Sequence, residues 1–152
     1  MKLIKLTLII LSLGIILIGY SQQNRDNKNF QGAKTTLKNY NALYILNQSD
    51  DKKIKGVLRN ISNALEDPRL KGKLHVELVA FGEGVELFKK SNHYDTLLLK
   101  LYNKGVILAQ RLNTIREKNI SKDELWPFIS YVPSGNGEII IRQYQGWAIV
   151  HP

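Results

Sequence analysis

The chain has 152 residues, of which 43% are hydrophobic and 23% charged, and this length and composition indicate one ordinary globular domain. It contains no cysteine, which excludes disulfides, thiolate metal sites and a cysteine nucleophile. The net charge of +9 favours anionic partners, but the basic residues form no run of five or more and accompany no nucleic-acid-binding module. We therefore expect no nucleic-acid partner.

Residues 1–21 predict a secretory signal peptide. Lys2 and Lys5 precede an almost wholly aliphatic run that ends at Gly19-Tyr20-Ser21, which is the order of a charged region, an apolar region and a cleavage site. We favour cleavage near Ser21 and an exported protein, either periplasmic or secreted. The alternative is an uncleaved anchor, because the apolar run is close to the ~20 residues that span a bilayer. A membrane contact is expected only in that case.

Residues 22–39 are polar, rich in Asn, Gln and Lys, and lack periodicity, so they predict a flexible linker. The domain is expected at 40–152, where short, mainly apolar runs typical of buried strands alternate with stripes of helical spacing. In chain order the expected elements are a strand at 42–46, a helix at 54–65, a strand at 74–81, a brief helix near 85–88, a helix at 94–102, a strand at 106–109, a short helix from 121 to about 127, a strand at 129–132 and a strand at 147–150.

One segment of this domain has conflicting signals. The run Ile139-Ile140-Ile141 is β-branched and favours a strand by propensity. Its place between two predicted strands favours a helix instead, and we expect a helix over about 138–145. Strands that alternate with helices predict an α/β fold in which helical layers cover both faces of a parallel sheet.

The polar cluster after the third predicted strand is the first candidate site. Gln110, Arg111, Asn113, Thr114 and Arg116 follow an apolar run, and ligands of open α/β sheets bind at the carboxyl ends of strands. The arginine fork of Arg111 suits a carboxylate, sulfate or phosphate, although a surface or interface arginine is the alternative. Asn113-Thr114 is expected to cap the following turn rather than to act in catalysis.

Two further loops leave the predicted strands. Asn47 opens a polar loop after the first strand, and Gly82-Glu83-Gly84 follows the second, where free backbone N–H groups can hold an anion. The glycine pair lacks the spacing of a nucleotide-binding fingerprint, so a simple turn is the alternative. Ser134, after the fourth strand, is expected to be a helix N-cap.

No catalytic, metal or cofactor site is expected. The three histidines, His75, His93 and His151, show no metal-ligand spacing and no arrangement with a carboxylate and a serine. Because no nucleophile–base pair can be identified, a binding protein is favoured over an enzyme.

Three motifs together resemble one family. Gly105-Val106 followed by Asn113-Thr114-x-Arg116, then VPSG at 132–135, then GWAIVHP at 146–152, are similar to the DsrE/DsrF-like (YchN-like) sulfur-relay family. The resemblance covers about 40–152 and implies a three-layer α/β/α fold with a parallel five-stranded sheet, of the flavodoxin-like topology class. It also implies a trimer or hexamer, or a complex with a partner subunit of the same family.

The family often carries a persulfide on a cysteine two residues before the Asn-Thr pair, and this chain has Arg111 there. The resemblance, together with the missing cysteine and the predicted signal peptide, therefore implies an exported, non-catalytic, oligomeric binding or scaffold protein for a small anionic ligand or a partner. An alternative is a cysteine-free subunit of a mixed sulfur-transfer complex, and a third is an enzyme that uses another chemistry, with Arg111, Asn113 and Glu83 in a cleft. The expected ligand-binding residues are Asn47, Gly82, Glu83, Gln110, Arg111, Asn113 and Arg116.

Overall fold

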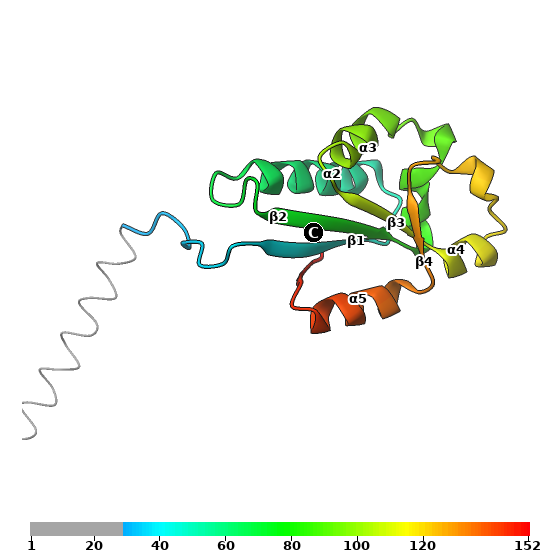
Figure 1. The fold of residues 1–152 in the computed structure, drawn as a ribbon. Helices are drawn as coiled ribbons and strands as arrows, with labels where there is room; N and C mark the ends of the chain where they lie inside the picture. The colour runs from blue at the N-terminus through cyan, green and yellow to red at the C-terminus, as the bar shows by residue number, and fades with distance from the viewer. Residues whose placement is uncertain (1–28) are drawn as a thin grey trace, which may run out of the picture. The chain divides into compact units, whose positions relative to one another are not determined.

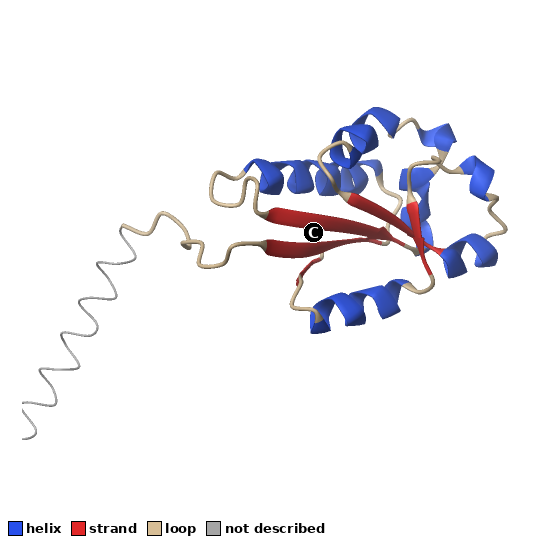
Figure 2. Cartoon of the chain, viewed as in Figure 1, coloured by secondary structure: helices blue, strands red, loops and turns tan. Residues whose placement is uncertain are grey.

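A parallel sheet forms the centre of the computed structural model, which describes residues 29–152 (Figures 1 and 2). The predicted signal peptide and the first part of the predicted linker lie outside the described residues. The five strands are β1 (Tyr40–Leu46), β2 (Leu74–Ala80), β3 (Ile107–Arg111), β4 (Ser130–Val132) and β5 (Ala148–Val150). Their order is β4-β3-β2-β1-β5, and every neighbouring pair is parallel. All five predicted strands are confirmed.

The helices form two unequal layers. Helices α2 (Asp51–Glu66) and α3 (Asp95–Tyr102) cover one face of the sheet, and α5 (Gly135–Tyr144) lies on the other (Figure 1). Right-handed connections explain this division, because β1 to β4 step across the sheet in one direction and only the return to β5 runs the opposite way. The predicted three-layer α/β/α architecture is confirmed. The strand order itself differs from the flavodoxin order, 2-1-3-4-5.

Short helices connect the middle strands. They are the 3-10 helices η1 (Gly82–Phe88), η2 (Lys90–Asn92) and η3 (Lys122–Glu124), and the α-helix α4 (Leu112–Glu117). Ser121 and Glu124 form a capping box, but it begins a single 3-10 turn rather than the predicted helix from 121 to about 127. The segment 35–152 forms one compact unit, which begins five residues before the predicted start of the domain. Within residues 29–152, no helix is both long enough and apolar enough to cross a bilayer.

The larger core lies between the sheet and the layer that contains α2 and α3. Ile61 of α2, Leu78 of β2 and Leu98 of α3 are fully buried there. Asp50 caps α2 by accepting a hydrogen bond from the Lys53 N–H, 2.9 Å away. The opposite face has only a small buried cluster, which consists of Leu43, Ile45, Val79 and Ala109.

The segment with conflicting sequence signals, residues 139–141, lies in helix α5. Ile139, Ile140 and Ile141 are helical as predicted, although the helix begins at Gly135, three residues before the expected start. The Ser134 hydroxyl accepts a hydrogen bond from the Gly137 N–H at 3.2 Å, so its predicted N-cap role is confirmed. A cap of this kind fixes where the helix begins despite the weak helix propensity of the isoleucines.

Candidate functional site

The seven expected binding residues all belong to one edge of the domain. Asn47 follows β1, Gly82 and Glu83 begin η1 after β2, and Gln110 and Arg111 end β3. The remaining two, Asn113 and Arg116, lie in α4 directly after β3. Because all strands are parallel, their carboxyl ends meet at this edge, where ligands of open α/β sheets bind.

The loops after β1 and β2 pack against each other without space between them. Gly82 has a φ of 55°, and a Cβ on Gly84 would lie 2.2 Å from the Leu46 carbonyl oxygen. The Gly82 N–H donates a hydrogen bond to Thr114 Oγ1 at 3.1 Å. The peptide N–H at the start of this loop, expected to be free for an anion, therefore already has an acceptor.

Thr114 is fully buried and has a role that the sequence did not predict. Asn113 and Thr114 were expected to cap a turn, but both lie inside α4, whose N-cap position is Arg111 and has no side-chain cap. The expectation is wrong because the helix starts immediately at the end of β3. Thr114 instead joins α4 to the loop after β2, which fixes the geometry of the edge.

The cations of this edge are held by acceptors of the chain itself. Arg111 Nη1 and Nη2 lie 3.3 and 3.1 Å from the two carboxylate oxygens of Glu117, a two-point pairing. Arg116 donates to Asn113 Oδ1 within the same helix. The sequence reasoning missed Glu117, whose position six residues after Arg111 is not a regular helical pairing distance.

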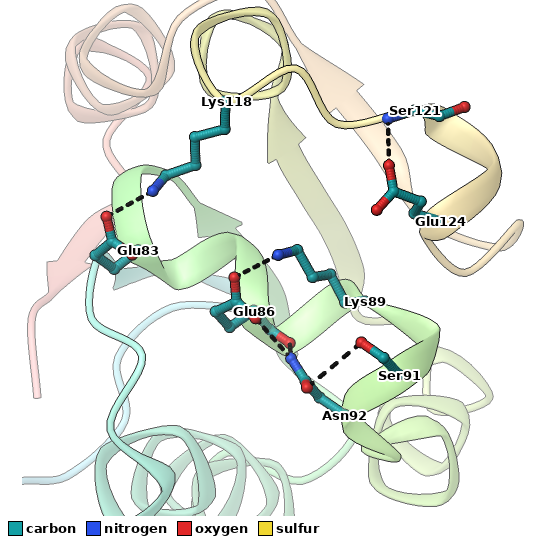
Figure 3. A network of polar contacts seen from close by, with 8 residues as sticks. All are labelled: Glu83, Glu86, Lys89, Ser91, Asn92, Lys118, Ser121 and Glu124. Carbon is teal, nitrogen blue, oxygen red and sulfur yellow. Dashed lines mark hydrogen bonds and ion pairs between the residues drawn. The ribbon is translucent and has the colours of Figure 1, made fainter.

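A second group of polar contacts surrounds η1 and η2 (Figure 3). Lys118 Nζ lies 2.6 Å from Glu83 Oε1, and Lys89 Nζ lies 2.6 Å from Glu86 Oε1. Asn92 Nδ2 donates to the carbonyl and the carboxylate of Glu86 at 2.9 and 2.8 Å. Burial raises the pKa of Glu86, but the hydrogen bonds from Lys89 and Asn92 outweigh it, and the pKa lies below its ordinary value.

An open cleft of about 430 Å³ lies beside this network and is lined by Ser49, Glu83, Glu86, Asn92 and Tyr94. The lining contains two carboxylates and no cation. The Tyr94 hydroxyl donates to Asp51 Oδ1 at 2.9 Å. These groups suit hydrogen bonding to a polar ligand, but they do not form the anion-binding fork expected from Arg111.

Gln110 lies in the core side of β3 and is fully buried. Its Nε2 donates to the Arg111 carbonyl oxygen at 3.0 Å, whereas its Oε1 accepts no hydrogen bond from residues 29–152. A buried acceptor without a donor costs about 1–3 kcal/mol, which makes this oxygen a place for a bound water or a ligand donor.

A buried charge cluster holds α5 on the sheet. Glu77, in the middle of β2, has only 1% of its surface exposed, and Arg142 Nη2 of α5 lies 2.6 Å from its Oε2. Arg142 Nε also lies 2.9 Å from Glu138 Oε1, and the guanidinium stacks over the Trp147 ring at 4.1 Å. Burial raises the pKa of Glu77, against the lowering effect of Arg142. The sequence reasoning missed this cluster.

The described residues offer no metal centre. Within 29–152, no group of three or more histidine or carboxylate side chains could hold a metal ion. His75, His93 and His151 lie in β2, after η2 and in the C-terminal tail.

The class that this geometry defines is a three-layer α/β/α domain with polar loops at the carboxyl edge of a parallel sheet. The chain is similar to the solved structure of a protein of unknown function, MTH1491 from Methanobacterium thermoautotrophicum, with a TM-score of 0.71 and 27% sequence identity. The match covers 75% of this chain and 100% of the other. Neither a protein-family model nor a curated protein matches the sequence.

Proposed function

We propose that this chain is an exported, DsrE-like, non-catalytic scaffold protein that assembles with a protein partner, in the first place with further copies of itself. The motif resemblance to the DsrE/DsrF-like family and the lack of cysteine support this proposal. The ion pairs of Arg111 and Lys118 favour partner binding over anion binding at the carboxyl edge, because both cations already have carboxylates.

The outer face of α5 carries the proposal. Ile140, Ile141 and Tyr144 are 57%, 53% and 90% exposed, and their spacing places them together on the side of the helix away from the sheet. Ile107, in β3, is also exposed, and strand alternation puts its side chain on the α5 face of the sheet. Exposed apolar side chains grouped on one side of a helix, as on α5, mark protein interaction surfaces.

Burial of the outer face of α5 would contribute a substantial part of the free energy of association. Fully burying an isoleucine side chain contributes about 1.5–3 kcal/mol, and an exposed tyrosine adds a large amphipathic surface. A stable interface buries at least about 1,000 Å², so α5 would form the centre of a contact that extends onto neighbouring elements. The thin coverage of this side of the sheet by one helix leaves that surface accessible.

Native mass spectrometry of the protein isolated from its own host tests this proposal. We expect a homo-oligomer for the unmodified chain and a monomer for Ile141→Ser/Tyr144→Ser. Leu99→Ser, which changes an exposed apolar residue of α3 on the opposite layer, is the matched control and should keep the oligomer.

The other outcomes distinguish the alternatives. A complex with a second, cysteine-containing chain would support the cysteine-free subunit of a sulfur-transfer complex instead. A monomer for the unmodified protein would refute the scaffold proposal.

A further inference from the structure

A cavity of about 350 Å³ lies between α2 and α3, on the layer opposite α5. Three leucines form its apolar part: Leu58 of α2 and Leu101 of α3 are buried, while Leu97 of α3 is 40% exposed. An exposed leucine at the mouth of a cavity leaves apolar surface in water that a bound molecule would cover.

The same cavity has a cationic lining. Lys55 and Arg59 lie one turn apart on α2, and Lys100 projects from α3. Lys55 pairs with Asp51 at 2.9 Å, but the side chains of Arg59 and Lys100 have no ion-pair or hydrogen-bond partner within residues 29–152. No carboxylate belongs to the lining.

The α2–α3 cavity differs from the carboxyl edge in whether its cations already have carboxylate partners, which decides whether an anion can bind there. At the edge, Arg111 and Lys118 are held by Glu117 and Glu83, so an incoming anion must displace a carboxylate. At the α2–α3 cavity two cations from two helices are available without such competition. An arginine also supplies a planar fork that binds carboxylates at two points.

We propose that the α2–α3 cavity binds a small amphiphilic carboxylate, a molecule with a short aliphatic body and one anionic head. The aliphatic body packs on Leu58, Leu97 and Leu101, and the carboxylate lies between Arg59 and Lys100. The volume is near the lower end of the range for small-molecule pockets, about 300–1,000 Å³, which fits a short chain rather than a two-chain lipid. This site is separate from the α5 surface and does not depend on the proposed assembly.

Titration calorimetry with octanoate tests the site, because octanoate carries both features of the proposed ligand. Octylammonium, which reverses the charge of the head, and acetate, which lacks the aliphatic body, should not bind. Arg59→Gln/Lys100→Gln should weaken octanoate binding about tenfold or more, since each charged hydrogen bond removed contributes this much. Lys52→Gln, on α2 but outside the lining, removes a positive charge elsewhere and should leave the affinity unchanged.

A variant at the apolar surface gives an independent measurement. Leu97→Ser changes an exposed side chain, so the fold should persist while octanoate binds several-fold more weakly. Equal binding of octanoate by Arg59→Gln/Lys100→Gln and the unmodified protein would overturn the proposal, as would equal binding of octylammonium.

Two measurements identify a different occupant. A loss of the oligomer in Arg59→Gln/Lys100→Gln would show that a second copy covers this cavity. Sedimentation with anionic phosphatidylglycerol vesicles that requires these cations, without octanoate binding, would show a membrane contact. Either result would overturn the small-ligand proposal and leave the α5 assembly to be judged by its own variants.

Discussion

Replacing Arg142 with methionine tests the account of how α5 is held on the sheet. Arg142 is the cation between Glu77 and Glu138, whose side chains are 1% and 17% exposed, and it is itself only 22% exposed. Methionine keeps most of the apolar length of the side chain but removes the charge and all its donors. Two neighbouring carboxylates would then remain in a poorly solvated place without a partner.

The cost of this change can be worked from the geometry. Removing one partner of a buried ion pair costs about 3–5 kcal/mol, and the partial exposure of Arg142 favours the lower end of this range. Loss of the contact with Trp147 adds about 0.5–1 kcal/mol. We expect Arg142→Met to lower the free energy of unfolding by about 3.5–4 kcal/mol at pH 7, measured by urea denaturation.

Two control variants separate charge from packing. Arg142→Lys keeps the charge but loses the planar fork, and we expect a smaller loss. Glu77→Leu/Arg142→Met replaces the pair with apolar groups and should lie within about 1 kcal/mol of the unmodified protein, because the buried carboxylate is gone as well.

The stability deficit of Arg142→Met should also depend on pH in a defined direction. Burial raises the pKa of Glu77, so the folded protein binds the carboxyl proton of Glu77 more tightly than the unfolded chain does. Ionised Glu77 therefore destabilises the fold, and this destabilisation develops as the pH rises above 4.5, the ordinary pKa of a glutamate. Without Arg142 the pKa rises further. The deficit of Arg142→Met should therefore be smaller at pH 5 than at pH 7. A deficit under about 1 kcal/mol, or one that is independent of pH, would refute the buried-pair account.

Three other substitutions should change the stability or the acid titration of the protein. Gly84→Ala should lower the free energy of unfolding by about 1–3 kcal/mol, because its Cβ would meet the Leu46 carbonyl oxygen. Gly56→Ala, inside α2 with nothing within 4 Å, should raise it by about 0.5–1 kcal/mol in the same assay. Two lysines, Lys104 foremost, lower the pKa of Glu66 to about 2. Lys104→Met should move this pKa toward 4.5 in an NMR titration. The loss of stability at acid pH, which falls between about 4.5 and 2 in the unmodified protein, should then be smaller and be complete at a higher pH.

The sequence predicted most of the fold because strands and helices here follow strong local patterns. Mainly apolar runs mark β1 to β3, although His75 and Glu77 interrupt the run of β2, and the apolar spacing from Ile54 to Leu65 marks α2. The isoleucine run of α5 was the hard case. Propensity favoured a strand, but a parallel connection needs a crossing element between β4 and β5, and Ser134 supplies the cap at its start.

The candidate site was predicted less well because its side chains take partners that the sequence does not indicate. Arg111 stands at the expected strand end, yet its pairing with Glu117 depends on α4 starting without a loop. Glu77 lies in an apolar strand, 65 residues before its partner Arg142. Neither pair has a regular spacing, so composition and periodicity could not reveal them.

The two faces of the domain differ in a way that makes the two proposals independent. On the α5 side, charge is buried in the Glu77–Arg142 pair and apolar side chains point outward, an arrangement that suits contact with protein. On the α2–α3 side, leucines line a cavity and the cations Arg59 and Lys100 have no partners within 29–152. The parallel sheet separates these layers, so substitutions on one side should not change the measurement made on the other. A variant that altered both assembly and octanoate binding would therefore indicate a change in the common core rather than in either site.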